Sequence, residues 1–371
     1  MYGHLVRRGL EAASEHLSHD NTRDWQALHD RYQMPAWGMV LLGSTTVAFV
    51  LFAMALEYTI RLLIVHLAIV ETPANAVVKV YRPVVECDGK KDVVDIEVEE
   101  THVVSDKPLT SSIKRTMKHI TSLGGFSNRW RGLPIFLVYT MIISVFHMLA
   151  VSLCGRAGVG TAVASFIADM SAALMTARIH CAWTHATITT GYKRYYERVI
   201  NRVQWKELLP AVALKVVGNY VFVIATLVSA GAVSPLMMRE TSLGIRAAIA
   251  LIPITTALSM SLLVVLPVNI MLVRKEASML AESEETAVPF DRTFGNRIIP
   301  GLNSLKLRDN WAGISRDTLY RVAMLHIKWI GIASVIAIVY FQVALLEMWA
   351  IMGEALPAML SAAKAHLQGM A

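Results

Sequence analysis

The sequence is poor in charge. Asp, Glu, Lys and Arg together make up 17% of its 371 residues, whereas a soluble domain carries about 25%. Hydrophobic residues make up 55% of the chain, and the mean hydropathy is +0.48. This composition excludes an ordinary soluble domain and indicates an integral membrane protein.

The sequence also lacks a disulfide framework and the motifs of enzyme chemistry. Its three cysteines, Cys87, Cys154 and Cys181, are too few and too scattered to stabilise a fold through disulfide bonds. No phosphate-binding glycine loop, cluster of metal ligands or nucleophile–base motif occurs in it. We therefore expect no enzyme activity, no metal site, no cofactor and no nucleic-acid partner.

A secretory signal is missing from the N-terminus. Residues 5–17 carry two arginines, but no unbroken apolar core follows them. Two glutamates in the same stretch disfavour a mitochondrial transit helix. We expect residues 1–36 to form an amphipathic or mobile tail, with a targeting peptide as the alternative, and residues 353–371 to form a C-terminal tail.

Six apolar stretches are long enough to cross a membrane, because a spanning helix needs roughly 20 mainly apolar residues. They are residues 37–70, 133–154, 159–188, 208–236, 247–273 and 322–352. They predict an all-α membrane domain over residues 37–352, built as three pseudo-repeated hairpins with short surface helices. The expected repeats are residues 37–154, 159–236 and 247–352.

The connections between these stretches alternate in length, and the long ones hold most of the Lys and Arg residues. Bases concentrate on the side of a membrane that is not translocated. We therefore expect the long connections on that side and both termini on the other. In the first long connection, residues 92–99 roughly alternate apolar with acidic side chains and predict a short strand or hairpin. Residues 107–120 predict a short surface helix whose bases face the head groups of anionic lipids and which Gly124 and Gly125 end.

Two of the apolar stretches end in the same pattern. Pro267 and Asn269 close the fifth stretch shortly before Arg274, and Pro73 and Asn75 close the first. A proline removes one backbone hydrogen bond and bends a helix. The pattern predicts an internal repeat and makes these five residues candidates for a hinge or gate.

With these motifs the chain resembles the mitochondrial carrier family in a divergent form. Gly124 or Gly125, followed by Trp130-Arg131-Gly132, resembles the motif that opens the even-numbered helices of that family. The resemblance implies three two-helix repeats, a mitochondrial membrane, and transport by alternating access; another organelle membrane is the alternative location.

The chain departs from that family at the repeated motif. Asn75 and Asn269 stand where the family places an acid, and Val78 and Leu272 stand where it places a base. The closing ring of salt bridges on the long-connection side therefore cannot form in the usual way. The second repeat has no proline at the corresponding place, residues 181–185.

The chain also resembles a group of fungal six-span proteins, through the run Val288-Pro289-Phe290-Asp291-Arg292-Thr293-Phe294-Gly295. Some members of that group are labelled ubiquitin carrier or conjugating proteins. No cysteine of this chain lies in the His-Pro-Asn context that such an activity would need, so we expect no conjugating activity.

Ionisable side chains within the spans are costly and are the first candidates for a functional site. Glu57 and Arg61 lie four residues apart and share a helix face, either as a structural pair or as part of a cavity lining. Arg178 either faces a wet interior or extends toward the long-connection side.

Lys215 is a further candidate for contact with a solute, and Asn219 lies one turn later on the same face. A buried lysine needs a counter-charge to stay protonated. Either an acid, such as Glu57 or Asp169, approaches Lys215, or an anion does.

Two functions follow from these features. The chain is predicted to be a carrier-like membrane protein that moves a small anionic solute by alternating access, with Arg178 and Lys215 holding the anion. The alternative is a non-transporting relative that acts as a membrane scaffold or adaptor. Its docking surface would be residues 281–295, an acidic turn followed by an extended strip; the alternative, which the composition favours, is a plain solvated loop.

Overall fold

The computed structural model describes residues 35–72, 77–84, 95–102, 108–156, 160–191, 195–239, 242–298 and 304–353. Backbone contacts divide the chain into two units, one of Met1–Ala55 with Ile330–Ala371 and one of Leu56–Trp329. The two predicted tails lie almost entirely outside the described residues, and Pro73 and Asn75 lie outside them as well.

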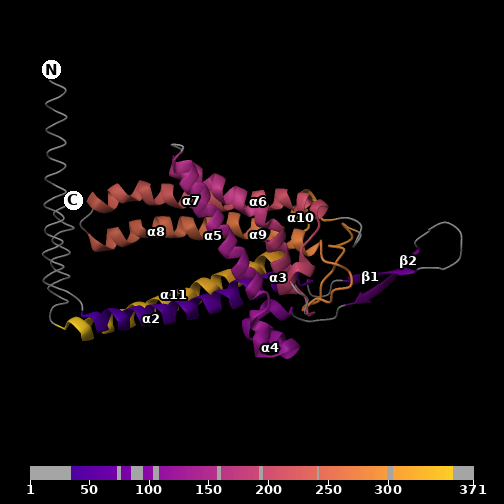
Figure 1. Ribbon diagram of the computed structural model, residues 1–371, viewed down its shortest axis with the longest axis horizontal. Helices are drawn as coiled ribbons and strands as arrows, with labels where there is room; N and C mark the ends of the chain where they lie inside the picture. Colours follow the sequence, from indigo (N-terminus) through magenta and orange to yellow (C-terminus); the bar gives the residue numbers. More distant parts are fainter. Residues whose placement is uncertain are drawn as a thin grey trace, which may run out of the picture. The chain divides into compact units, whose positions relative to one another are not determined.

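Six helices in the described part of the chain are long and apolar enough to cross a membrane. They are Ala36–Val70, Phe126–Cys154, Ala162–Ile188, Arg202–Met237, Gly244–Ala277 and Arg316–Met352. This confirms the prediction of an all-α, multi-pass membrane protein with six spans (Figure 1). We refer to these helices as the first to sixth spans.

The first and fifth spans each contain a widened, π-helical segment. The first span comprises α2 (Ala36–Leu56), the π-helical Glu57–Ile64 and α3 (Val65–Val70). The fifth comprises α8, the π-helical Ser261–Val265 and α9, where α8 is Leu243–Met260 and α9 is Leu266–Ala277. Segments of this kind are rare and often mark functional places.

The π-helical segment of the fifth span has a direct cause in the sequence. Pro267 has no N–H, so it cannot donate the α-helical hydrogen bond to the carbonyl four residues earlier, that of Leu263. Leu263 lies in the middle of the π-helical segment. The wider turn accommodates the break in the hydrogen-bond pattern without ending the helix.

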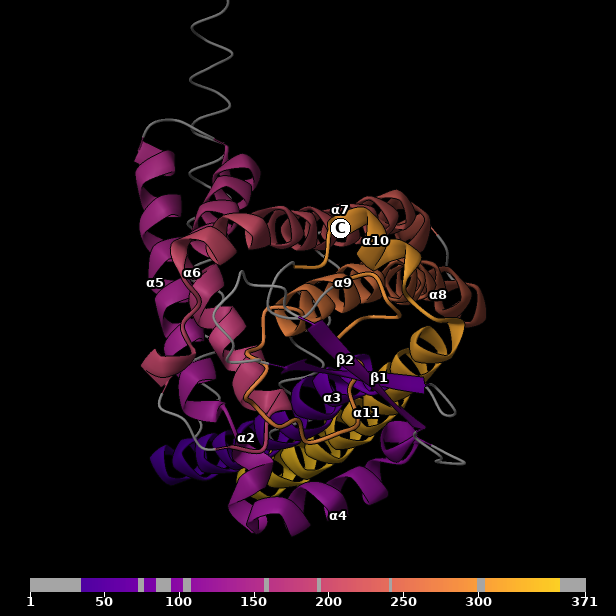
Figure 2. The same ribbon diagram turned by 90° about the vertical axis from the view of Figure 1, so that its right-hand side faces the viewer.

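Neighbouring spans pair across the short connections. The second span, α5 (Leu133–Arg156), lies beside the third, α6 (Thr161–Ile188), and the fourth, α7 (Arg202–Arg239), lies beside α8. Figure 2 shows both pairs. Because a short connection forces consecutive helices to run antiparallel, these two pairs follow from the connection lengths. The predicted repeat bounds, which join the spans across the long connections, stay a prediction.

The first and last spans pair in the other unit, where α2 lies beside α11 (Arg316–Met352). The Thr45 hydroxyl donates to Glu347 Oε1 at 2.6 Å, and the Thr46 hydroxyl lies 3.0 Å from that of Tyr340. Interhelical hydrogen bonds of this kind help to hold spans together in lipid.

The three odd-numbered spans meet at the end of the bundle from which the long connections leave. There α3, α6 and α9 each contact the other two. The contact is filled by fully buried side chains, such as Leu67 from α3, Ile188 from α6 and Ile270 from α9. We call this the long-connection end. Its core is packed with apolar side chains.

The first long connection contains a hairpin and a surface helix. Strand β1 (Val77–Val84) pairs antiparallel with β2 (Asp95–His102), which agrees with the predicted strand. Helix α4 (Ile113–Gly124) buries Thr116 and Ile120 and exposes its three bases, Lys114, Arg115 and Lys118. The third long connection contains the short helix α10 (Leu307–Ala312).

Candidate functional site

Three consecutive charged residues, Arg274, Lys275 and Glu276, form the last turn of α9, and all three are buried. Consecutive residues of a helix project about 100° apart, so the three side chains reach three different parts of the protein. Charges buried within a membrane bundle are costly and tend to be functional. This turn is therefore the centre of the candidate site.

Glu276 is bound by α6 through both carboxylate oxygens. Its Oε1 lies 2.6 Å from Nδ1 of His180, and its Oε2 accepts a hydrogen bond from the Thr184 hydroxyl at 2.5 Å. Its main-chain carbonyl lies 2.8 Å from Nε2 of His185. Since Glu276 has no exposed surface, these bonds replace the water that the carboxylate has lost.

His180 connects Glu276 to Lys215 on α7. The Lys215 Nζ lies 3.2 Å from Nε2 of His180. An ammonium group can only donate, so Nε2 accepts this bond and Nδ1 carries the proton that His180 donates to Glu276. The three side chains form one continuous chain of hydrogen bonds from α7 through α6 to α9. We call it the Lys–His–Glu chain.

The lysine end of this chain opens on a cavity of about 170 Å³. His180, Lys215 and Asn219 line it, as do Asp169 and Tyr220. A water molecule occupies about 30 Å³ in the liquid, so the cavity suits a solute of a few heavy atoms. The structure thus brings together Lys215 and Asn219, two of the residues predicted to contact a solute.

The two acids predicted as partners for Lys215 bind elsewhere. The Arg61 Nη1 lies 2.5 Å from Glu57 Oε1, so these two residues form the predicted pair on one helix face, with side chains about two-fifths exposed. Asp169 lies 2.6 Å from Nδ1 of His147 and accepts a hydrogen bond from the Tyr220 hydroxyl at 2.7 Å. The carboxylate linked to Lys215 is that of Glu276, through His180.

Arg178 does not reach the cavity. Its Nε donates to the main-chain carbonyl of Ile200 at 2.7 Å, in the connection between α6 and α7. The half-buried side chain therefore fixes that connection to the third span. Of the two cations predicted to hold an anion, the structure places only Lys215 at the cavity.

The predicted hinge residues that the structure describes lie on α9. Pro267 is buried next to the π-helical segment, and Asn269 is half-buried. Pro73 and Asn75 fall outside the described residues. The close approach of α7 at Gly218, where an added Cβ would lie 3.0 Å from Val268 Cγ2, shows that this part of α9 is tightly packed.

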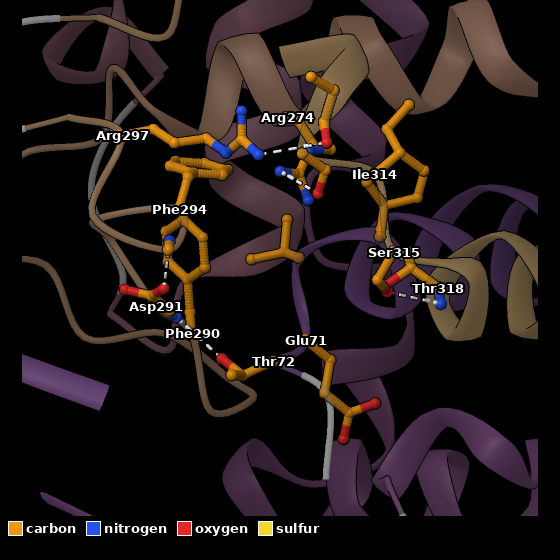
Figure 3. Close-up of a pocket in the computed structure, with 15 residues that line it drawn as sticks. Glu71, Thr72, Arg274, Phe290, Asp291, Phe294, Arg297, Ile314, Ser315 and Thr318 are labelled. Atoms are coloured by element: carbon orange, nitrogen blue, oxygen red, sulfur yellow. Dashed lines mark hydrogen bonds between the residues drawn. The ribbon is translucent and has the colours of Figure 1, made fainter. Parts of the chain in front are cut away.

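Arg274 binds the third long connection instead of another span. Its Nε donates to Asn310 Oδ1 and its Nη2 to the carbonyl of Gly313, both at 3.1 Å, and the guanidinium lies 5.0 Å from the centre of the Phe294 ring. Figure 3 shows Arg274 at one end of a cavity of about 360 Å³ that has Glu71 at its other end. Arg274 therefore secures the α10 region to α9.

Lys275 points toward α7. Its Nζ donates to the Ser304 hydroxyl at 2.7 Å and lies 3.7 Å from Oε2 of Glu207. The last turn of α9 thus binds α6 through Glu276, α7 through Lys275 and the α10 region through Arg274. Four segments, α6, α7, α9 and the α10 region, therefore pack together at this turn.

A second polar contact joins the odd-numbered spans. His66 of α3 lies with its Nδ1 3.1 Å from the hydroxyl of Thr187 on α6. Together with the bond from Thr184 to Glu276, it links all three odd-numbered spans through α6. These bonds lie beside the apolar core of the long-connection end, so that end is closed.

The strip 281–295 covers the same end. The Ala287 N–H donates to the carbonyl of Ile188 at 2.8 Å, and the Thr72 N–H donates to that of Pro289 at 2.9 Å. The strip is thereby hydrogen-bonded across the ends of α6 and α3. Ala287 and Val288 are buried, and exposure is concentrated in the preceding acidic turn, residues 281–285.

Arg292 fastens this acidic turn to the strip. Its guanidinium donates to the carbonyls of Ala281 and Glu284. Burial lowers the pKa of Arg292 from its ordinary value, while the nearby acids Glu282 and Glu284 act in the opposite direction. The ordinary pKa of an arginine side chain lies far above physiological pH, so the Arg292 guanidinium keeps its charge there.

The sequence pattern did not identify Glu276 or His180. Glu276 directly follows two bases at a helix end, which is the pattern of a residue that has reached water, and His180 lies off the stripe formed by Arg178, Cys181 and His185 on α6. The sequence does contain one indication, which is that three charged residues are consecutive in one helix turn. Their side chains point in three directions, so all three can face water only if the whole turn is exposed.

Among the described residues, no group of three or more His, Cys, Asp or Glu side chains is arranged to hold a metal ion. No family model matches the sequence, and no curated protein matches it.

Proposed function

We propose that this multi-pass membrane protein is carrier-like and moves a small anionic solute by alternating access, with the cavity beside Lys215 as its solute site. The observation that carries the proposal is the Lys–His–Glu chain, which joins this cavity to the closed long-connection end. A solute that changes the position of Lys215 would act directly on the contact between α6 and α9.

The lining of the cavity favours an anion. Lys215 supplies a positive charge and Asn219 an amide that can donate hydrogen bonds, while Asp169 is already occupied by His147 and Tyr220. Surroundings of low polarity strengthen the attraction between an ammonium group and an anion. The small volume favours a compact oxyanion.

The bonds at the long-connection end are suited to opening and closing. Access from that side would need α6 to separate from α9 and α3, which would break the bonds of Glu276 to His180, Thr184 and His185 and the bond between His66 and Thr187. The bonds to the Glu276 carboxylate contribute about 1.5–3 kcal/mol each and the neutral ones about 1 kcal/mol each, so the state of that carboxylate governs opening. The π-helical segment before Pro267 supplies a place at which α9 can bend.

Uptake into proteoliposomes tests the proposal. The purified protein is reconstituted and offered radiolabelled phosphate, sulfate and formate. We expect uptake of at least one of them, and we expect Lys215→Gln to lower it at least about tenfold, which corresponds to 1.4 kcal/mol of lost binding. Lys306→Gln is the matched control, since Lys306 is an exposed lysine outside the cavity. Equal uptake by both variants would remove the proposed site.

The mitochondrial membrane is the location that we propose on the basis of the motifs shared with mitochondrial carriers. Bases in the long connections, among them the exposed Lys114, Arg115 and Lys118 of α4, suit contact with anionic lipid head groups. Fractionation of cells that express a tagged chain tests the location. Recovery of the tag outside the mitochondrial fraction would overturn it.

A scaffold is the second candidate function, and the exposure of the acidic turn 281–285 favours it. Because the strip that follows is hydrogen-bonded across the ends of α3 and α6, its deletion would expose those ends. Reversal of the exposed charges is the cleaner test. If a basic partner docks there, Glu282→Lys combined with Glu285→Lys should abolish its recovery while Lys215→Gln leaves it unchanged.

A further inference from the structure

We infer that the Lys–His–Glu chain takes up one proton for each monovalent anion that binds in the cavity, so that the protein moves the anion together with a proton. The inference rests on the proposed function and adds the co-transported species to it. It is based on the charges and hydrogen bonds that surround Lys215, His180 and Glu276.

The balance of charge is the first reason. Before an anion binds, the positive charge of Lys215 and the negative charge of Glu276 cancel, with His180 neutral between them. A monovalent anion beside Lys215 would leave one net negative charge within the bundle. A buried net charge is costly in a membrane protein. One proton on the chain restores neutrality.

The geometry supplies the route. Lys215 gives a proton to Nε2 of His180, and His180 gives the proton on its Nδ1 to Oε1 of Glu276, across the contacts of 3.2 Å and 2.6 Å. One N–H bond breaks and one forms at the imidazole, so His180 stays neutral. Lys215 then recovers its proton from water in the cavity, and because Nε2 now carries a proton and cannot accept, the ammonium group donates to the bound anion instead. The result is one proton taken from water and one protonated carboxyl at Glu276.

The proton also has a mechanical consequence. A carboxylate accepts from both His180 and Thr184, whereas the protonated carboxyl must donate with one of its oxygens. Its charge-assisted bonds become ordinary ones, which are about half as strong. The contact between α9 and α6 weakens when anion and proton are both bound. This couples the loaded state to opening of the long-connection end.

Other charged and titratable groups face the chain from each neighbouring helix. Tyr139 of α5 packs its ring edge against His180 at 5.2 Å between centroids, and His66 of α3 interacts electrostatically with Glu276 and Lys215. The positive charge of Arg61 also repels that of Lys215. On α6 itself, His185 and Cys181 lie 3.5 Å apart beside the main chain of Glu276. These groups surround the chain, but none of them interrupts it.

Asp169 and His147 form the competing proton acceptor. Asp169 lines the same cavity and lies 2.6 Å from His147, but both side chains are about two-fifths exposed. A proton taken up there would have no direct hydrogen bond to the contact between α6 and α9. Variants of His147 and His180 therefore distinguish the two routes.

Proton uptake on binding of nitrate tests the inference. Nitrate is monovalent and does not titrate near neutral pH, so a proton that leaves the solution must bind to the protein. The detergent-purified protein is mixed with nitrate in weakly buffered solution that contains a pH indicator, and nitrate binding is measured in parallel by calorimetry. We expect about one proton per nitrate bound, as neutrality of the buried site requires.

Four variants give the controls. His180→Gln can still donate to Glu276 but cannot pass a proton on, and Glu276→Gln removes the acceptor, so proton uptake per nitrate bound should be close to zero in both. His180→Gln should also bind nitrate more weakly, because the bound anion then leaves one uncompensated negative charge. His326 lies 3.0 Å from the Ser261 hydroxyl and does not line the cavity, so His326→Gln should keep the proton uptake of the unaltered protein. His147→Gln keeps an amide that can donate to Asp169, and it should leave the number of protons taken up per nitrate unchanged. Thermal unfolding of each variant shows whether it is folded, and the two blocking variants substitute for each other if one fails to fold.

The outcomes separate the inference from the function on which it rests. Nitrate binding without proton uptake, or uptake that persists in a folded His180→Gln protein and disappears in His147→Gln, overturns the inference and leaves the anion site intact. No binding of nitrate, formate or phosphate to the unaltered protein overturns the anion site itself, and the inference fails with it.

Discussion

The carboxylate of Glu71 and the guanidinium of Arg321 form a buried ion pair, with 2.9 Å between Oε2 and Nη1. Glu71 also accepts hydrogen bonds from the main-chain N–H groups of Leu109 and Thr110, at 2.6 Å and 3.1 Å. One side chain thus joins the end of the first span to the first long connection and to the start of the sixth span. The pair fastens segments that are 250 residues apart.

Removal of one partner of this pair should be strongly destabilising. Arg321→Gln leaves a carboxylate that is 3% exposed without its counter-charge, which costs about 3–5 kcal/mol. Thermal and denaturant unfolding in detergent measure the loss. Asp317→Asn is the control, because Asp317 contacts the same arginine but is 54% exposed, and we expect a cost within about 1 kcal/mol. Equal losses in both variants would contradict this account.

Removal of the Thr184 hydroxyl should weaken the contact between α6 and α9. Thr184→Val leaves Oε2 of the fully buried Glu276 without its donor, at a cost of about 1–3 kcal/mol in stability. Thr184→Ser keeps the hydroxyl and should recover most of that loss. If the serine variant is as unstable as the valine variant, shape rather than the hydrogen bond decides the effect.

Two glycines of α7 should respond in opposite ways to alanine. At Gly218 an added Cβ would lie 3.0 Å and 3.3 Å from the two γ-carbons of Val268, and we expect overpacking to cost about 1–3 kcal/mol. At Gly231 the added Cβ meets no atom within 4 Å, so the better helix propensity of alanine should hold or raise the melting temperature. A Gly218→Ala protein as stable as Gly231→Ala would show that α7 and α9 are not closely packed.

Pro267→Ala separates stability from transport. The alanine N–H can donate to the carbonyl of Leu263, so the variant should fold at least as well as the unaltered protein. If bending at the π-helical segment accompanies each transport cycle, a straighter helix should slow the initial rate of solute uptake by about tenfold. An unchanged rate, with a raised melting temperature, would mean that the segment only accommodates the proline.

Much of this architecture could be predicted from composition and spacing. The six apolar stretches coincide with the observed helices to within a few residues at most ends, because lipid requires continuous apolar helices of a fixed minimum length. The pair Glu57–Arg61 follows from helix periodicity alone. Gly125, with a φ of 76°, ends the surface helix as its position suggested.

The core of the candidate site could not be predicted in the same way. The links between Lys215, His180 and Glu276 join residues up to 96 positions apart in the sequence, and local periodicity carries no information about which helices meet. Arg178 was expected to share the site with Lys215, but in the structure it binds the carbonyl of Ile200. A buried arginine can satisfy its donors with main-chain carbonyls, and a sequence does not show which acceptors will be nearby.

The side-by-side placement of α2 and α11 has a consequence for biogenesis. The hydrogen bond from Thr45 to Glu347 can form only once both the first and the last spans are in the bilayer. Until α11 is inserted, α2 depends on its own hydrophobicity to remain in the lipid. A chain truncated before residue 316 would therefore leave α2 without its partner helix.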